Sequence, residues 1–230
     1  MKVEAIVVAA GSGRRLKRKV SKALVKVLNI PIAIRTLKTF SIHPLITNII
    51  IVCKNDDLPI IDSLIRKYKI KKIKLLCAGG KKRVDSVNNG VKRLDKDTNI
   101  VVIHDVARPF VDKKTITECI KKTAVSGACV VGVPVISTIK ESNKNGNFIK
   151  NTLDRTRLWQ IQTPQAFKVD LIKMVLKRKG RFSPTDDSLL VERLGRKVAL
   201  FKGSYSNIKI TTPEDILFAE SLIRNRNYKK

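Results

Sequence analysis

The chain has 230 residues, a length that suits a single α/β domain spanning residues 1–230. Its hydrophobic content of 43% is enough for a continuous core, but no apolar run approaches the roughly 20 residues of a membrane span. The four cysteines are widely spaced and the two histidines lack ligand spacing. This argues against a zinc site and indicates free thiols in the reducing cytoplasm.

The formal net charge of +29 is the unusual bulk property of this chain. A basic surface attracts nucleic acid, and that alternative stays open at this point. The lysines are nevertheless spread along the whole chain, and aromatic residues that could stack on bases make up only 5%. We therefore favour a basic surface that attracts anionic small molecules, with no nucleic acid and no membrane as partner.

The first predicted element is a buried strand over the apolar run Val3 to Val8, which leads into Ala9-Ala10-Gly11-Ser12-Gly13-Arg14-Arg15. Glycines let backbone N–H groups approach phosphate oxygens, and arginines add permanently charged donors. The loop lacks both the third glycine of a dinucleotide fingerprint and the Gly-Lys-Ser/Thr of a Walker A loop. We predict phosphate binding, with an ordinary strand-to-helix turn as the alternative.

Strands and helices are expected to alternate along the chain. Apolar, β-branched runs predict strands at Val3–Ala9, Asn48–Cys53, Ile73–Cys77, Ile100–His104, Cys129–Pro134 and Val198–Lys202. Apolar residues at helical spacing predict helices at Pro31–Phe40, Leu58–Lys69, Arg83–Leu94 and Lys113–Val125. The alternation favours a mainly parallel twisted sheet flanked by helices. Because ligands bind beyond the carboxyl ends of such strands, the loops after Ala9, Cys77 and His104 should converge on one site.

Two of these loops carry further candidate residues. Gly79 and Gly80 free backbone groups that could read the edge of a planar base, and Ser86 could bond a ribose or base oxygen, although a plain turn explains the segment equally well. Asp105 offers a carboxylate for Mg²⁺ beside phosphates, whereas a lone Asp in this place is more often a cap or turn residue. The nearby Arg108 favours an anionic ligand, and His104 is expected to be structural.

A β-hairpin is predicted over residues 135–155, because alternating residues flank the turn signal Asn145-Gly146. Isolated hairpins are marginal in water, and its apolar side chains, among them Ile136, Phe148 and Ile149, need covering. The hairpin either packs on its own domain or reaches a second subunit as an arm. The need to bury these side chains favours the arm.

Two later segments also carry local signals. Thr163-Pro164-Gln165 is interpreted as a rigid turn, because proline fixes its own φ. Thr212-Pro213 is a helix start, followed by acidic residues that complement the helix dipole, and the helix is expected to run to about Arg224.

Taken together, these segments resemble the 2-C-methyl-D-erythritol 4-phosphate cytidylyltransferase family over nearly the whole chain. The shared motifs, in chain order, are Ala-Ala-Gly-x-Gly-Arg-Arg, Gly-Gly-x-x-Arg-x-Asp-Ser-Val, His-Asp-x-Ala-Arg-Pro, Asp-Arg, Leu-Trp-x-x-x-Thr-Pro-Gln-x-Phe and Asn-Ile-Lys-x-Thr. The resemblance implies a Rossmann-like nucleotidyltransferase domain that converts CTP and methylerythritol phosphate to the cytidine diphosphate derivative and pyrophosphate. It also implies Mg²⁺ as cofactor, and a homodimer in which residues 135–155 form the arm.

The same resemblance implies roles for individual residues. Arg15 and Lys22 fall where the family has its transition-state stabilisers, and Asp105 falls on its Mg²⁺ ligand. The positions matching those that place the methylerythritol phosphate are Arg155, Lys209, Thr138 and Arg108. The positions matching the CTP pocket are Ala9, Ala10, Gly11, Gly13, Gly80 and Ser86.

The chain departs from the family pattern in a few places. Ser21 and Ala23 flank Lys22 where Pro and Gln are usual, and Lys81 and Ser137 replace commonly acidic residues. The nearest alternative is a ribitol-5-phosphate cytidylyltransferase, which shares the glycine loops and the Thr-Pro-Gln segment. The sequence from Thr152 to Arg155, with Leu158-Trp159, favours the isoprenoid enzyme.

Overall fold

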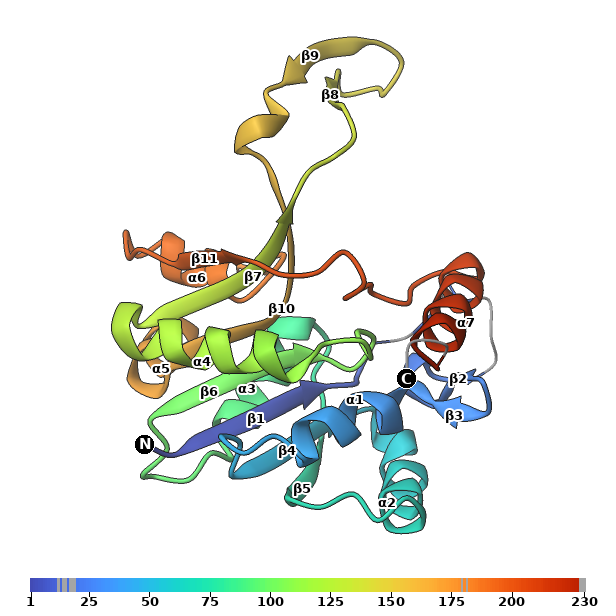
Figure 1. The fold of residues 1–230 in the computed structure, drawn as a ribbon. Coiled ribbons are helices and arrows are strands. Elements are labelled where there is room, and N and C mark those ends of the chain that lie inside the picture. The colour runs from blue at the N-terminus through green and yellow to red at the C-terminus, as the bar shows by residue number, and fades with distance from the viewer. Residues whose placement is uncertain (12, 14–15, 17–19, 179, 181, 228–230) are drawn as a thin grey trace.

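The fold was analysed in a computed structural model, which describes residues 1–11, 13, 16, 20–178, 180 and 182–227. A seven-stranded sheet in the order β11-β7-β10-β6-β1-β4-β5 runs through the middle of the molecule (Figure 1). Its strands are β1 (Val3–Val8), β4 (Asn48–Cys53), β5 (Ile73–Ala78), β6 (Ile100–Asp105), β7 (Ala128–Pro134), β10 (Trp159–Lys168) and β11 (Ala199–Lys202). The six strands predicted from sequence are all present, to within one residue at each end.

Most neighbouring strands in this sheet are parallel, as the sequence predicts. The exception is β10, which pairs antiparallel with both β6 and β7. The interpretation of Thr163-Pro164-Gln165 as a turn is wrong: the segment lies inside β10 and contains a cis Thr163–Pro164 peptide. The ladder between β10 and β7 shifts register between Ile161 and Gln165, and an irregularity of this kind accommodates a proline, which cannot donate to the ladder.

Helices cover both faces of the sheet, so the central strands β1, β4 and β6 are buried on both sides and read as continuous apolar runs. One face packs against α1 (Ile32–Ser41), α2 (Leu58–Lys67) and α4 (Lys113–Ser126). The other face packs against α3 (Arg83–Val91), α5 (Val169–Arg178) and α6 (Ser188–Glu192). Every helix in the described part of the chain is too short or too polar to span a bilayer.

A third, smaller core lies beside the sheet and supports one side of the candidate site. There α7 (Pro213–Asn227) packs through Ile216 and Ala219 near the short ribbon of β2 (Lys26–Val27) and β3 (Ile30–Pro31). The helix starts where the sequence predicts and continues three residues past Arg224. The carboxylate of Asp215 accepts the backbone N–H groups of Thr211 and Thr212, which satisfies two donors at its start.

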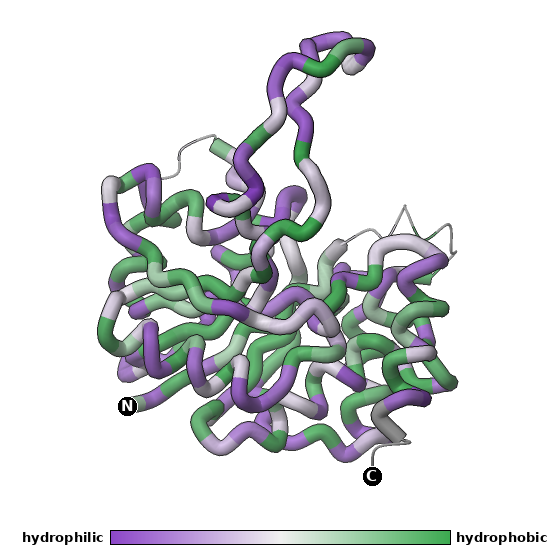
Figure 2. The backbone as a smooth tube through the Cα atoms, turned by 45° about the horizontal axis from the view of Figure 1, so that its top comes forward, coloured by the Kyte–Doolittle hydropathy of each residue, from purple (hydrophilic) through white to green (hydrophobic). Residues whose placement is uncertain are grey.

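The predicted hairpin is present and stands clear of the rest of the chain in two views (Figures 1 and 2). It consists of β8 (Ile139–Ser142) and β9 (Ile149–Leu153), joined by a loop in which Gly146 has a φ of 72°. Three of its apolar side chains, Ile136, Phe148 and Ile149, are 65%, 74% and 66% exposed. The hairpin therefore does not pack on its own domain.

Candidate active site

The loops that follow β1, β5 and β6 meet at the carboxyl edge of the sheet, as predicted, and line a cavity of about 710 Å³. We call it the first cavity. Of the residues predicted to bind nucleotide, six lie on its wall: Ala9, Ala10, Gly11, Gly13, Gly80 and Ser86. Separate segments of the chain thus converge on one site because parallel strands end at the same edge of the sheet.

Close packing between two of these loops sets the shape of the first cavity. A Cβ at Gly79 would lie 2.4 Å from the Cβ of Ala10 and 2.8 Å from the Ser86 Oγ, so only glycine fits there. The Ser86 hydroxyl accepts the Gly80 N–H at 3.0 Å and donates to the Lys82 carbonyl at 3.3 Å. Gly11 faces open space, because a Cβ added there would meet no described atom within 4 Å.

We expect Gly79→Ala and Gly11→Ala to fail in different ways. The first forces two loops apart, and overpacking of this kind costs about 1–3 kcal/mol, so both the melting temperature and the affinity for the predicted nucleotide should fall. The second has room for a methyl group, so it should leave the melting temperature unchanged. Because Gly11 lines the first cavity, the added methyl group should weaken only nucleotide binding. Thermal unfolding and calorimetric titration with nucleoside triphosphate check both expectations, and equal melting temperatures for the two variants would contradict them.

Lys22 also lines the first cavity, at the start of the short 3-10 helix η2 (Lys22–Leu24). Its backbone lies against Gly13, where a Cβ would approach the Lys22 nitrogen to 3.1 Å. The preceding Ser21 has a φ of −62°, the value that proline would impose, so the loop keeps a proline-like conformation without the ring. Arg15, the other predicted stabiliser, lies outside the described residues.

A second cavity, of about 1010 Å³, adjoins the first. The two cavities share three wall residues, Arg83, Asp105 and Lys209. Arg108 and Thr163 line only the second cavity. Two ligands bound in these cavities would therefore meet at one carboxylate and two cations.

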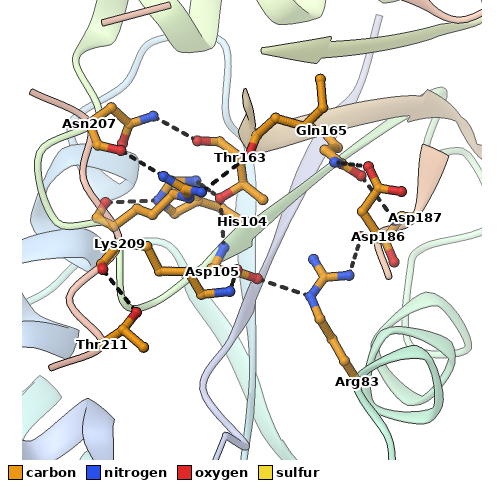
Figure 3. A network of polar contacts seen from close by, with 12 residues as sticks. Arg83, His104, Asp105, Thr163, Gln165, Asp186, Asp187, Asn207, Lys209 and Thr211 are labelled. Atoms are coloured by element: carbon orange, nitrogen blue, oxygen red, sulfur yellow. Dashed lines mark hydrogen bonds and ion pairs between the residues drawn. The ribbon is translucent and has the colours of Figure 1, made fainter. Parts of the chain in front are cut away.

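Asp105 sits between those two cations (Figure 3). Its Oδ1 accepts from the Arg83 Nε at 3.1 Å, and its Oδ2 accepts from the Lys209 Nζ at 2.5 Å. Burial alone would raise the pKa of this carboxyl group, but the charges of Arg83 and Lys209 outweigh it and hold the pKa well below its ordinary value. Asp105 is therefore a carboxylate at neutral pH, although only 8% of the residue is exposed.

A chain of hydrogen bonds fixes the backbone of Asp105. Its N–H donates to the Thr163 Oγ1 at 3.1 Å, and that hydroxyl lies 3.1 Å from the His104 Nδ1. The His104 Nε2 lies 3.0 Å from the Arg108 carbonyl, which can only accept, so the imidazole proton is on Nε2. Burial lowers the pKa of His104 to about 4, which keeps the ring neutral.

The chain is similar to known proteins over nearly its whole length. The family model for 2-C-methyl-D-erythritol 4-phosphate cytidylyltransferase matches residues 3–225. A relative of that name from Clostridium botulinum (strain ATCC 19397 / Type A) is 41% identical over 220 residues, which cover 95% of this chain and 96% of the relative. One from Clostridioides difficile (strain 630) is 43% identical over 221 residues, covering 95% and 92%.

The chain belongs to the 2-C-methyl-D-erythritol 4-phosphate cytidylyltransferase family. Solved structures agree. The 4-diphosphocytidyl-2C-methyl-D-erythritol synthase of Anaerococcus prevotii DSM 20548 matches with a TM-score of 0.86 and 33% identity, covering 97% of this chain and 96% of that one. The 2-C-methyl-D-erythritol 4-phosphate cytidylyltransferase of Thermus thermophilus matches with a TM-score of 0.80 and 27% identity, covering 97% and 100%.

The four residues that the family pattern assigns to substrate positioning fall into two groups. Lys209 lines both cavities, and Arg108 lines the second. The Arg108 guanidinium donates to the carbonyls of Asn207 and Ile161, at 2.7 and 3.3 Å. Thr138 and Arg155 lie on the exposed arm and line neither cavity in the part of the chain that the structure describes. Arg155 instead donates to the Ile136 carbonyl at the foot of the arm.

Sequence reasoning missed several residues of this cytidylyltransferase site. Arg83 belongs to the Gly-Gly-x-x-Arg motif, in which the glycines and Ser86 are the predicted ligand contacts, yet Arg83 itself lines both cavities. Thr163 is predicted to lie in a turn, but it holds the backbone of Asp105. Asp187 forms an ion pair with Arg83, which lies 104 residues away in the chain, and no local sequence pattern predicts this pair.

Proposed function

We propose that this chain transfers CMP from CTP to 2-C-methyl-D-erythritol 4-phosphate, giving 4-diphosphocytidyl-2-C-methyl-D-erythritol and pyrophosphate, a step of isoprenoid precursor synthesis. The observation that carries the proposal is the pair of adjoining cavities that share Arg83, Asp105 and Lys209. The first cavity has the glycine-lined wall suited to a nucleoside triphosphate. The second has the volume and the basic side chains for a phosphorylated acceptor.

The chemistry requires cations more than it requires a base. A phosphate oxygen of the acceptor attacks the α-phosphorus of CTP, the bond to the bridging oxygen breaks, and pyrophosphate leaves on the opposite side. The nucleophile is already an anion, so the difficulty is bringing two anions together and stabilising the charge on the five-coordinate phosphorus. Lys22 and Arg83 on the first cavity, and Lys209 between the cavities, supply fixed positive charge for this. Arg15 is assigned the same role on the family pattern alone.

Mg²⁺ is part of the proposal, and the residues fit it. Mg²⁺ in phosphoryl-transfer sites takes one or two carboxylates together with substrate phosphates. Asp105 is ionised and lines both cavities, and each of its oxygens accepts one described hydrogen bond, which leaves lone pairs for a metal. Bound there, the ion would neutralise triphosphate charge. Among the described residues, no three or more His, Cys, Asp or Glu side chains form a metal-binding group.

The arm supports a homodimer. Arg155 and Thr138 match acceptor-positioning residues of the family, yet both lie on the exposed hairpin, away from the cavities of their own chain. We propose that a second subunit covers Phe148 and Ile149 and that Arg155 of the partner subunit completes the second cavity. We also propose a cytoplasmic location, because the wide spacing of the four cysteines in the sequence favours a reducing compartment.

A pyrophosphate-release assay with CTP and each candidate acceptor tests the function. We expect turnover with 2-C-methyl-D-erythritol 4-phosphate and release of one pyrophosphate per cytidylated product. Turnover of ribitol 5-phosphate alone would overturn the choice of acceptor. DNA or RNA binding at physiological salt without any CTP turnover would overturn the enzyme assignment.

A further inference from the structure

Asp187 is a fully buried carboxylate that does not cap the helix that follows it. It lies directly before α6, yet its side chain makes no cap hydrogen bond to that helix. Asp186 serves the helix instead: its Oδ1 accepts the Leu189 N–H at 3.2 Å, and its Oδ2 accepts the Ser188 hydroxyl at 2.9 Å. Because a buried charge is costly unless it is paired, Asp187 needs a different explanation.

Its partner is Arg83, which touches both substrate cavities. The Asp187 Oδ2 accepts from one terminal nitrogen of Arg83 at 2.8 Å, while the Arg83 Nε donates to Asp105 at 3.1 Å (Figure 3). The guanidinium is therefore held between two carboxylates that come from distant parts of the chain. Burial alone would lower the pKa of Arg83, but the two carboxylates raise it above its ordinary value, so the group stays charged.

Asp187 is itself tied to the central sheet. The Gln165 Oε1 accepts the backbone N–H groups of Asp187 and Ser188, at 3.1 and 3.3 Å. The Gln165 amide nitrogen donates to Asp186 at 2.8 Å. Gln165 is buried on β10, directly opposite Ile103 of β6, the strand that ends in Asp105. One rigid sheet thus sets the places of both carboxylates that hold Arg83.

We propose that Asp187 is a positioning residue for nucleotidyl transfer: it fixes the Arg83 guanidinium on the wall shared by the two cavities. This inference rests on the function proposed above. Stabilisation of a charged transition state depends on cations that are already in place. Without Asp187, Arg83 keeps only its bond to Asp105 among the contacts described and can turn away from the phosphates. The residue would act on catalysis through Arg83, without touching substrate.

A double-mutant cycle tests the proposal, with kcat and KM measured for Asp187→Ala, Arg83→Ala and the double variant. We expect Asp187→Ala to lower kcat by about 10- to 100-fold, the size of effect that a misplaced group produces. In the Arg83→Ala background the same change should cause no further loss, because nothing remains to be positioned. Losses that multiply in the double variant would overturn the proposal, since they would show that Asp187 acts independently of Arg83.

Two further variants separate positioning from folding. Asp57→Ala is the matched control. Like Asp187, Asp57 is a buried carboxylate directly before a helix, and one of its oxygens has no hydrogen-bond partner among the described residues. Asp57 lines neither cavity. It should lower the melting temperature and leave kcat unchanged. Asp187→Asn preserves shape and can still accept one bond from Arg83, so it should fold and recover part of the lost activity. Wild-type kcat in both folded Asp187 variants would contradict the proposal.

The outcome is distinguishable from failure of the proposed function. If the wild-type chain turns over neither sugar phosphate, the acceptor assignment fails, and the same cycle can be measured as CTP affinity by calorimetry. Non-additive losses of affinity would still support the role of Asp187 on Arg83, and additive losses would overturn it.

Discussion

Lys22→Ala is expected to lower kcat by about 10²- to 10³-fold, the usual effect of removing one preorganised stabiliser of transition-state charge. Lys22 lines the first cavity, where its cation can meet the triphosphate. Since the reaction joins two anions, this charge matters more in the transition state than in the ground state. KM for CTP should therefore change much less than kcat. Steady-state pyrophosphate release with both substrates varied measures the two constants separately.

The control for this prediction is Lys26→Ala. Lys26 lies four residues further along, is exposed on β2 and lines neither cavity. Its removal changes the net charge by the same amount, so it reports on any general attraction of anionic substrates to the basic surface. Wild-type kcat in Lys22→Ala, or an equal loss in Lys26→Ala, would remove Lys22 from the mechanism.

Mixed dimers built from two impaired variants are expected to regain about half of the wild-type activity. If the arm completes the site of the other subunit, a dimer of one Lys22→Ala chain and one Arg155→Ala chain contains one site with both residues intact. Its other site lacks both. Co-expression with two different affinity tags isolates these mixed dimers, and each parent homodimer serves as a control. Arg155→Ala alone should mainly raise KM for the sugar phosphate, because Arg155 is assigned to the acceptor side.

The result depends on whether each arm completes the site of its own chain or that of the other subunit. An arm that folds back to its own cavity would leave the mixed dimer with no more activity than the average of its parents. The same result would follow if Arg155 took no part in acceptor binding. Either outcome would contradict the dimer part of the proposed function.

Much of the fold could be predicted because its signals are local. The β-branched runs of β1, β4 and β6 identify strands buried on both faces, and the parallel arrangement then places their following loops at one edge. The strand β10 was missed because it contains a proline and the polar residues Gln162, Thr163 and Gln165, which are buried through tertiary contacts. Neither periodicity nor composition reveals such a strand.

The candidate site likewise has residues with a local sequence signal and residues that only the tertiary structure reveals. Glycine loops and Asp105 could be found from their position after apolar runs. The ion pairs around Asp105 could not be predicted. Lys209 lies 104 residues from Asp105 in the chain, and Asp187, which pairs with Arg83, lies 104 residues from Arg83. Ion pairs between residues so far apart in the chain depend on the packing of the segment before α6 and of the Lys209 segment against the sheet. The motif resemblance identified Lys209 without predicting its contact.

A crystal structure of the chain with CTP and Mg²⁺ tests the central claim most directly. We expect the cytosine end of the nucleotide beside Gly80 and Ser86, and the triphosphate in the first cavity within reach of Lys22 and Arg83, with the metal on Asp105. The α-phosphorus should then face the second cavity across Lys209. A nucleotide bound elsewhere, with those ammonium and guanidinium groups directed into solvent, would contradict the account.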